Sequence, residues 1–458
     1  MVITFFKSLT SIQRLTFSFI IVIIIGSLLL SMPITHYPDA PATTYLDHLF
    51  NVVSMVCVTG LSVFPVASVY NGLGQVIVIL LMQIGGLGLV TLISVSLYLM
   101  RRRMNLSEQH LLQSALNYDN SNNLRQYLFS AYKLTLVFEL AMAVVLLFDF
   151  IPRFGVGHGI FNAIFLSVSA FCNAGFDNLG DASLRPFVLN PLINIVLAIL
   201  IFSGGIGFAV WLDLRDAVKR FLTDKPYRFT TFSRSLSNQT RLVLATTGIV
   251  LLLGTVLSWL MEYKNPKTIG HYNIFQQWMV SFFQSVTMRT AGFSTISYVD
   301  THPVTNVLYM LQMIIGGAPG GTAGGVKVTA AAITFLLFKA ELTGQTEVTF
   351  RNRVIANKVI KQTFTILIFF FTILTVGYMA LLLFEPHHNP LALLFEAISA
   401  IATVGVSMDL TPQLSTGGRI VIMVLMFVGR VGPITVLLSL LQRKRKDIHY
   451  AQTTINMG

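Results

Sequence analysis

The amino-acid sequence predicts an all-α, polytopic membrane protein made of four similar units around a central axis. Two observations lead to this prediction. Hydrophobic residues make up 54% of the 458 residues and charged residues only 11%, and the mean hydropathy is +0.72, a composition typical of membrane proteins. In addition, a window that begins with phenylalanine and ends with glycine occurs four times in the chain. Four copies at a nearly constant period indicate an internal repeat rather than coincidence.

The repeated window has the same length in all four copies. Each copy ends with a glycine ten residues after its phenylalanine, and the glycines are separated by 115, 117 and 113 residues. The copies are FNVVSMVCVTG (50–60), FLSVSAFCNAG (165–175), FFQSVTMRTAG (282–292) and FEAISAIATVG (395–405). We therefore expect the chain to consist of four units, at 1–104, 105–225, 226–345 and 346–458.

Each window lies between two long apolar runs. A helix needs about 20 apolar residues to cross roughly 30 Å of hydrocarbon, and the runs of that length are 15–32, 74–100, 128–150, 188–212, 242–261, 304–338, 363–384 and 420–441. Shorter apolar stretches lie between them, at 46–58, 160–172, 275–288 and 391–402. A dozen helical residues reach only about 18 Å, so each short stretch should enter the membrane and stop part-way. The sequence predicts four M1-P-M2 units, with eight transmembrane helices and four pore helices.

The distribution of positive charge predicts the orientation of the chain. The formal net charge is +12, and when alternate loops are assigned to alternate sides, 23 of the 31 lysines and arginines fall on one side and five on the other. The positive-inside rule then places both termini in the cytoplasm of a multi-pass protein of the cell membrane. The basic character thus indicates topology rather than nucleic-acid binding. The three remaining basic residues fall within the membrane region: Arg289, Lys327 and Arg430.

The residues around the four glycines favour a cation filter made of backbone carbonyls, as in potassium channels. Carbonyl oxygens from converging segments can replace the hydration shell of K⁺, and glycine reaches positive φ without a Cβ penalty. The side chains differ between copies, so the expected filter has only approximate fourfold symmetry. The candidate filter residues are Val58, Thr59, Gly60, Leu61, Asn173, Ala174, Gly175, Phe176, Thr290, Ala291, Gly292, Phe293, Thr403, Val404, Gly405 and Val406.

Other conspicuous residues give no sign of a second site. Cys57 and Cys172 share one column of the window, where a disulfide or metal pair is the alternative to the favoured interpretation as small buried hydrophobes. Histidines of the outward loops lack metal-ligand spacing, so solvated positions are expected. The connectors show no strand alternation and are expected to form short helices and loops that dock a partner: 101–127, 213–241 and 339–361.

At this point the chain resembles the Trk/Ktr/HKT superfamily of potassium transporters. The resemblance rests on four M1-P-M2 units, one glycine per pore loop and the run Arg-Thr-Ala-Gly-Phe at 289–293. Eight crossings without an additional N-terminal pair are similar to the Ktr-type membrane subunit. The resemblance implies K⁺ uptake, often dependent on Na⁺, through a homodimer with one pore per subunit and control by a cytosolic octameric ring of nucleotide-binding RCK subunits. In plant relatives a serine in the first glycine column accompanies Na⁺ preference, and Gly60 therefore supports K⁺.

The apolar run 304–338 is too long for one crossing, and its middle is rich in glycine. Six glycines and a proline in ten positions should break the helix, although tandem G-x-x-x-G packing is the alternative. We expect a flexible gate beneath the filter, which is also what the resemblance implies for this segment. The candidate gate residues are Gly316, Gly317, Ala318, Pro319, Gly320, Gly321, Thr322, Ala323, Gly324, Gly325, Lys327 and Arg430.

The three intramembrane cations each have two interpretations. Arg430 replaces a glycine of the other M2 copies, and it either faces the pore and donates to carbonyls of the gate or forms a buried ion pair with Glu139 or Glu396. Arg289 is expected to anchor the back of the filter. Lys327 either binds the gate segment or extends toward the cytoplasm.

These observations lead to one main hypothesis and two alternatives. The main hypothesis is the ion-conducting subunit of a K⁺ uptake system, which is not an enzyme and needs no organic cofactor. The first alternative is a relative that prefers Na⁺ or transports K⁺ and Na⁺ together. The second is a membrane enzyme or scaffold, but the sequence has no zinc motif, nucleophile triad signature or nucleotide loop to support it.

Overall fold

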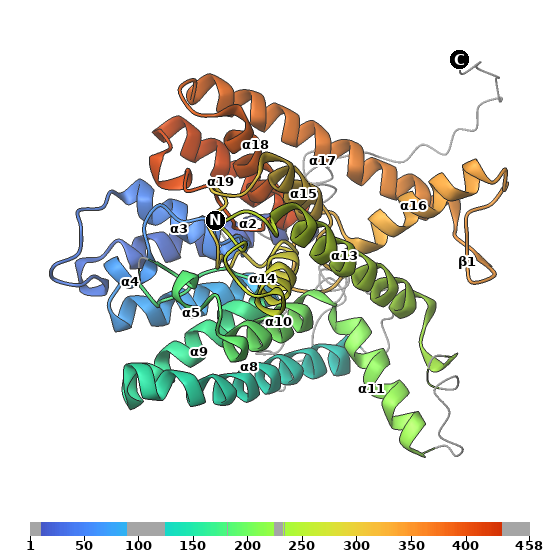
Figure 1. Ribbon diagram of the computed structural model, residues 1–458, viewed down its shortest axis with the longest axis horizontal. Helices are drawn as coiled ribbons and strands as arrows, with labels where there is room; N and C mark the ends of the chain where they lie inside the picture. Colours follow the sequence, from blue (N-terminus) through green and yellow to red (C-terminus); the bar gives the residue numbers. More distant parts are fainter. Residues whose placement is uncertain (1–10, 89–123, 181, 224–231, 233, 433–458) are drawn as a thin grey trace.

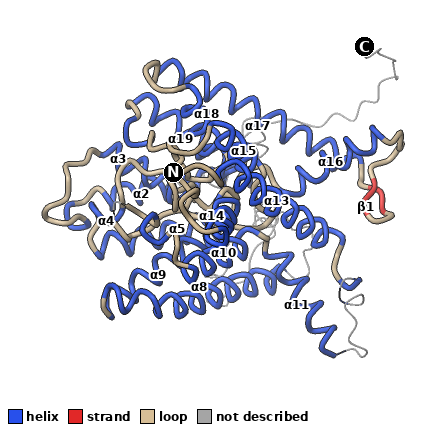
Figure 2. The backbone as a smooth tube through the Cα atoms, in the orientation of Figure 1, coloured by secondary structure: helices blue, strands red, loops and turns tan. Residues whose placement is uncertain are grey.

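The computed structural model describes residues 11–88, 124–180, 182–223, 232 and 234–432. Most of the described chain is helical, and the long helices lie roughly along the axis from the β1 end of the molecule to the α4 end (Figure 1). Figure 2 shows that loops connect the helices at both ends and that strands occur only at the β1 end of the described chain. The elements before residue 206 are α2 (Ser11–Leu30), α3 (Tyr45–Cys57), α4 (Val66–Val69), α5 (Gly72–Leu87), α8 (Leu124–Phe154), α9 (Val156–Cys172) and α10 (Pro191–Gly205).

The second half of the chain has the same alternation of longer and shorter helices. Its elements are α11 (Phe208–Thr223), α13 (Asn238–Glu262), α14 (Ile274–Thr287), α15 (Pro303–Ile314), α16 (Val328–Leu342), β1 (Thr349–Phe350), β2 (Arg353–Val354), α17 (Asn357–Phe384), α18 (Pro390–Ile401) and α19 (Thr416–Val431). Short 3-10 turns complete the loops at Pro33–Thr35, Arg185–Phe187 and Thr411–Gln413.

Four short helices occupy the positions predicted from the repeated window. These helices, α3, α9, α14 and α18, begin within four residues of the predicted starts and end within one residue of the predicted ends. Their starts follow from capping chemistry: the side chains of Asn273 and Asn389 accept backbone N–H groups of α14 and α18, and Thr44 and Asp47 form a capping box on α3. The prediction of a short apolar helix in each window is confirmed.

The helices are arranged in a closed ring around the four short helices. α5 packs on α9, α10 on α14, α15 on α18, and α19 returns to α3. The buried residues of the four windows lie in two adjoining apolar clusters, one built around Phe50 and Phe395 and one around Phe171 and Phe283. This order brings the ends of all four windows toward one centre.

In the part of the chain that the structure describes, the longest apolar helices account for at most four of the eight predicted crossings. Among the described residues, α8, α13 and α17 are each long and apolar enough to cross a membrane, and α10 with α11 forms a bent pair that passes the same test. The runs 74–100 and 420–441 are described only as far as residues 88 and 432, and the predicted unit boundaries at 104/105 and 225/226 lie outside the described residues. The same holds for the two termini, whose cytoplasmic placement therefore stays a prediction.

One apolar run is bent, and one prediction about secondary structure was wrong. In the run 188–212, α10 ends at Gly205 and the chain turns by 101° into α11 through Gly207, which has a φ of 90°. The connector 339–361 is not limited to helix and loop, because β1 and β2 pair antiparallel around Arg351 and Asn352. Strands of two residues are too short to show alternation in the sequence.

One histidine also differs from the expectation of a solvated position. His48 lies in the first turn of α3 and is buried, and its Nδ1 lies 2.9 Å from the hydroxyl of Tyr70. Its ring stacks on that of His36. No group of three or more His, Cys, Asp or Glu side chains in the described part of the chain is arranged to hold a metal ion.

Candidate pore centre and intramembrane loop

Each short helix ends in the same unusual backbone conformation. The residue two positions before each window glycine is left-handed: Val58 (φ 55°), Asn173 (φ 57°), Thr290 (φ 63°) and Thr403 (φ 52°). The glycines themselves also have positive φ, at 100° for Gly60, 72° for Gly175, 85° for Gly292 and 94° for Gly405. Alternating positive φ values reverse the direction of successive carbonyls, so the backbone leaves the helix with its oxygens directed to one side.

Hydroxyl groups of the short helices hold these turns in place. Ser54, Ser169 and Ser399 stand in the same column of the window, and their side-chain oxygens accept the N–H of Gly60, Phe176 and Gly405 at 3.0–3.1 Å. In the third copy, Thr287 instead donates to the carbonyl of Phe293 at 2.7 Å. These hydroxyl groups were not predicted, although a serine at one column in three of the four copies is a usable signal.

The carbonyls before the four glycines form a ring. The backbone atom closest to a Cβ built on Gly60 is the oxygen of Ala174, at 2.9 Å, and the corresponding atom at Gly175 is the oxygen of Ala291, at 2.8 Å. The same relationship continues around the circle, from Gly292 to the oxygen of Val404 at 2.7 Å and from Gly405 to the oxygen of Thr59. Each window thus presents its glycine to a carbonyl of the next window, and four backbone oxygens surround one axis.

No side chain fits at the centre of this ring. A Cβ on Gly60 would lie 3.2 Å from the Cα of Gly175 and 3.3 Å from that of Gly405, and a Cβ on Gly175 would lie 2.9 Å from the Cα of Gly292. These neighbours are backbone atoms that cannot rotate away. The four glycines are therefore required both by their positive φ and by the approach of the neighbouring segments.

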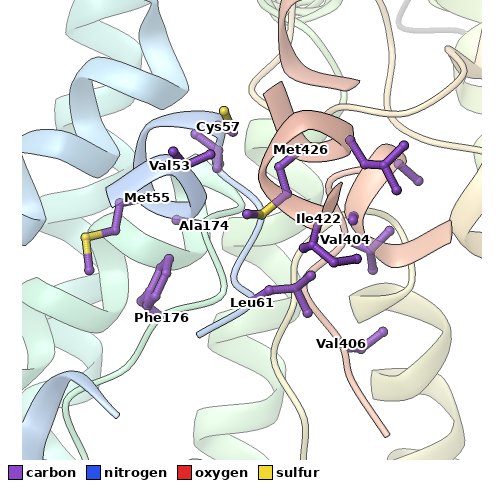
Figure 3. Close-up of a cluster of buried hydrophobic side chains, with 14 of the residues drawn as sticks. Val53, Met55, Cys57, Leu61, Ala174, Phe176, Val404, Val406, Ile422 and Met426 are labelled. Atoms are coloured by element: carbon purple, nitrogen blue, oxygen red, sulfur yellow. The ribbon is translucent and has the colours of Figure 1, made fainter. Parts of the chain in front are cut away.

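The side chains next to the glycines point away from the ring into apolar packing. Figure 3 shows Leu61 and Val404 beside Ile422 and Met426 of α19, and all four belong to the same buried cluster. Behind the first two windows, Cys57 and Cys172 are buried free thiols, as the interpretation as small buried hydrophobes predicted. Because the side chains form the supporting layer, their variation between copies leaves the backbone lining unchanged.

The long apolar run 304–338 is interrupted as its composition predicted. α15 ends at Ile314 and α16 begins at Val328. The ends of the intervening segment, 315–327, pair with each other, since the N–H of Gly316 donates to the carbonyl of Val326 at 2.8 Å. We call residues 315–327 the intramembrane loop. It is a closed excursion between two half-helices rather than a continuous G-x-x-x-G packing surface.

The intramembrane loop lies directly against the filter turns. The N–H of Gly324 donates to the hydroxyl of Thr290 at 3.2 Å, and the hydroxyl of Thr403 is the nearest neighbour of a Cβ built on Gly324. On its other side the loop binds the bend after α10, where the N–H of Ala318 donates to the carbonyl of Gly205 at 2.8 Å. The loop is therefore in contact with two filter turns and with the second repeat.

Arg430 binds backbone carbonyls rather than an acid. Its guanidinium donates to the carbonyls of Thr322 in the intramembrane loop and of Gly85 and Gly86 at the end of α5, the last at 3.0 Å. Among the described residues it has no ion pair, with Glu139, Glu396 or any other acid. The contacts of Arg430 therefore fit the interpretation as a donor to carbonyls and do not fit the alternative of a buried ion pair.

The two other intramembrane cations also bind the intramembrane loop. The guanidinium of Arg289 donates to the carbonyl of Gly316 at 3.2 Å, and the ammonium of Lys327 donates to the carbonyl of Ala323 at 2.7 Å. Arg289 thereby connects the third filter turn to the loop. All three cations that the sequence placed inside the membrane converge on one short segment, which the sequence alone did not predict for Arg289.

Comparison with known proteins places the chain among membrane transporters. The model of the TrkH family, described as cation transport protein, matches residues 4–447. The chain is 33% identical to the Ktr system potassium uptake protein B of Bacillus subtilis, over 97% of this chain and 96% of that protein. It is 34% identical to the protein of the same name from Vibrio alginolyticus, over 96% and 93% of the two chains.

Further comparisons agree. The chain is 32% identical to the potassium/sodium uptake protein NtpJ of Enterococcus hirae, over 99% of this chain and 98% of that protein. The crystal structure of the potassium transporter TrkH from Vibrio parahaemolyticus has the same fold, with a TM-score of 0.73 over 94% of this chain and 84% of that one, at 17% identity. These relatives are named as transport proteins and not as enzymes, which agrees with the prediction of a transport protein. The chain belongs to the TrkH family of cation transport proteins and is a multi-pass membrane protein.

Proposed function

We propose that this chain is the ion-conducting subunit of a K⁺ uptake system, with K⁺ as the transported ion. The observation that carries the proposal is the ring of backbone oxygens from Thr59, Ala174, Ala291 and Val404 around one axis. In the proposed architecture four M1-P-M2 units, with eight crossings and four pore helices, surround this ring. Dehydrated K⁺ exchanges its water ligands for the carbonyls. The C-terminal ends of the four short helices face the pore and add a negative potential that favours a cation.

The intramembrane loop is the proposed gate. The proposal is supported by the contacts of Gly324 with the filter turns of Thr290 and Thr403. In the proposed closed state the loop lies in the path of an ion that leaves the filter. The cationic side chain of Arg430 holds it there. Opening requires the loop to give up its bonds to Arg430 and to the bend after α10, which is a local rearrangement of a glycine-rich segment. Deletion of residues 316–325 should accordingly raise ion flux.

The proposed assembly is a homodimer controlled by a cytosolic octameric ring of RCK-type nucleotide-binding subunits. Two relatives are named as parts of a Ktr system, which supports a membrane subunit that works with other proteins. The excess of lysine and arginine on one side of the predicted topology marks the proposed cytoplasmic face. On that face, the segments between the repeats form the proposed binding surface for the RCK ring.

The proposal is tested by expression in cells that lack their own K⁺ uptake. The chain, co-expressed with its cytosolic partner, should restore growth at low K⁺. The test variant is Gly60→Ser in the ring. Its matched control is Gly248→Ala in α13, where an added Cβ meets no atom within 4 Å. Growth with Gly248→Ala but not with Gly60→Ser supports the proposal, and failure of the unaltered protein to restore growth contradicts it.

A second candidate function is transport of Na⁺, alone or together with K⁺. The name of the relative NtpJ, a potassium/sodium uptake protein, favours this candidate. Flux measured with each ion alone and with both ions distinguishes the candidates. Uptake that requires both ions supports symport, whereas K⁺ flux without Na⁺ supports the K⁺ pathway.

A further inference from the structure

Four arginines line one cavity between the start of α13 and the β1–β2 hairpin. Figure 1 shows the hairpin at one end of the molecule. The cavity has a volume of about 710 Å³. Arg234 and Arg241 line it from the segment that begins α13, and Arg351 and Arg353 line it from the β1–β2 hairpin. No acidic residue is among the described residues that line it. By the predicted unit boundaries, the start of α13 belongs to the third repeat and the hairpin to the beginning of the fourth.

The four guanidinium groups have no counter-charge within the described part of the chain. No ion pair or side-chain hydrogen bond of Arg234, Arg241, Arg351 or Arg353 is formed there, and Nε of Arg241 is buried without a partner. The carboxylate of Asp213 accepts the N–H of Ser237 at 2.8 Å, but among the described residues it forms no ion pair with any of the four arginines. Four positive charges around one volume repel each other unless an anion joins them.

Other groups of the cavity also favour an anion. Ser237 is the N-cap of the 25-residue helix α13, and its side chain accepts the N–H of Thr240 at 3.2 Å. The positive end of the helix dipole thus faces the cavity. Asn238 and Asn352 add side-chain amide donors to the lining. This combination of guanidinium, amide and helix N-terminus provides bidentate as well as single donors, as phosphate recognition requires.

The hairpin turn presents its arginine in an unfavourable backbone conformation. Arg351 and Asn352 are both left-handed, with φ of 50° and 61°, between the paired residues Phe350 and Arg353. Two-residue turns of this kind strongly prefer Asn-Gly or Gly-Gly. Two arginines flanking Asn352 therefore serve the cavity rather than the turn.

The cavity lies at the depth expected for lipid headgroups. Arg241 is in the first turn of α13, and the exposed apolar side chains of Ile249, Leu252 and Leu253 follow on the same helix. Eight helical residues separate Arg241 from Ile249, which corresponds to about 12 Å along the axis. If this apolar surface faces the membrane, the arginines stand just outside it, where they are also accessible from the adjacent solution.

We propose that this cavity binds a phosphate group, carried either by an anionic phospholipid or by a soluble phosphate compound. The bound phosphate accepts hydrogen bonds from Arg241 and from Arg353 and so connects the start of α13 to the hairpin. Since α16 leads from the intramembrane loop to this hairpin, the phosphate also restrains the lower half of the interrupted helix. The binding site itself does not depend on the identity of the transported ion.

The test compares the unaltered full-length protein with the double variant Arg241→Gln/Arg353→Gln. The matched control is Lys358→Gln/Lys361→Gln, which removes the same charge from the start of α17 outside the cavity lining. In one arm, native mass spectrometry counts phosphatidylglycerol retained from mixed phosphatidylglycerol–phosphatidylcholine nanodiscs. In the other arm, the shift of the unfolding temperature is titrated with inorganic pyrophosphate in neutral detergent.

We expect the unaltered protein and the lysine control to bind one of the two probes at least tenfold more tightly than the arginine double variant. Retention of phosphatidylglycerol identifies a lipid headgroup as the source, and a pyrophosphate-dependent shift identifies a soluble compound. If the double variant does not fold, Arg351→Gln on the exposed turn replaces it, with the same expectation at a smaller factor. Equal binding by the unaltered protein and the arginine variants in both arms would overturn the proposal.

Discussion

The guanidinium of Arg430 on α19 donates to the backbone carbonyl of Thr322 in the intramembrane loop, and so joins the fourth repeat to the third beneath the filter. The same group binds Gly85 and Gly86 of the first repeat. One side chain therefore connects three repeats next to the proposed gate. In the other three repeats the corresponding residue is a glycine, which has no side chain to make such contacts. These glycines are Gly86, Gly205 and Gly317.

Replacement of Arg430 should open the pathway. The variant Arg430→Gln removes the charged hydrogen bonds to the loop, each of which contributes about 1.5–3 kcal/mol. If the closed loop depends on them, the flux of K⁺ into proteoliposomes should rise by roughly tenfold or more, since about 1.4 kcal/mol corresponds to a factor of ten. Arg215→Gln, an exposed change on α11, is the control. Unchanged or reduced flux in folded Arg430→Gln would refute the gate assignment.

A side chain in the glycine ring should impair selectivity. In Gly60→Ser the new Cβ lies 2.9 Å from the carbonyl oxygen of Ala174, and φ of 100° is unfavourable for serine. The neighbouring oxygens must move, and we expect the ratio of K⁺ to Na⁺ flux to fall by about tenfold, which needs only about 1.4 kcal/mol of differential binding. Gly248→Ala should leave the ratio unchanged. A normal ratio in Gly60→Ser would show that the ring does not select the ion.

The serines behind the filter should matter for stability and conduction together. Ser399→Ala leaves the N–H of Gly405 without its acceptor, and an unsatisfied buried donor costs about 1–3 kcal/mol. We expect a lower unfolding temperature and a reduced K⁺ flux. Ser68→Ala is the control, because its hydroxyl binds the Pro65 carbonyl at the exposed start of α4. Identical unfolding temperatures for Ser399→Ala and Ser68→Ala would contradict this account.

The outer loops of the second and fourth repeats meet in one ion pair. Arg185 and Asp409 are 3.0 Å apart, and their side chains remain 46% and 55% exposed. An exposed pair of this kind contributes about 0–1 kcal/mol. A double-mutant cycle with Arg185→Ala and Asp409→Ala should therefore give a coupling energy below about 1 kcal/mol that vanishes at high salt. A larger, salt-independent coupling would indicate that the pair closes the outer mouth of the pore.

The repeated backbone plan could be predicted from the sequence because its signals are local. The short helices follow from length and apolar content, and the break before Val328 follows from the glycines and the proline between Gly316 and Gly325. The left-handed residues before the glycines could not be predicted, since Val58 and Thr403 are β-branched and disfavour that conformation. The bend after Gly205 was not predicted, although Gly204, Gly205 and Gly207 are a weaker form of the same glycine signal, without a proline and within a run of ordinary length.

The partners of the intramembrane cations required the three-dimensional structure. The position of Arg430 was evident because it breaks the pattern of M2 glycines. Its acceptors are the backbone oxygens of Thr322 and Gly85, which belong to other repeats. Every residue has a backbone carbonyl, so such acceptors leave no signal in the sequence. Sequence patterns describe side chains and therefore do not reveal which carbonyls a distant arginine reaches.

The ring of four carbonyls is tested most directly by K⁺ and Na⁺ flux into proteoliposomes that contain the purified protein and its cytosolic partner. The account predicts K⁺ uptake that exceeds Na⁺ uptake in the unaltered protein and in Gly248→Ala, and loss of that preference in Gly60→Ser, Gly175→Ser, Gly292→Ser and Gly405→Ser alike. A preference that survives at any of the four positions, in protein that remains folded, would contradict the proposal that all four repeats together form the ion-selective ring.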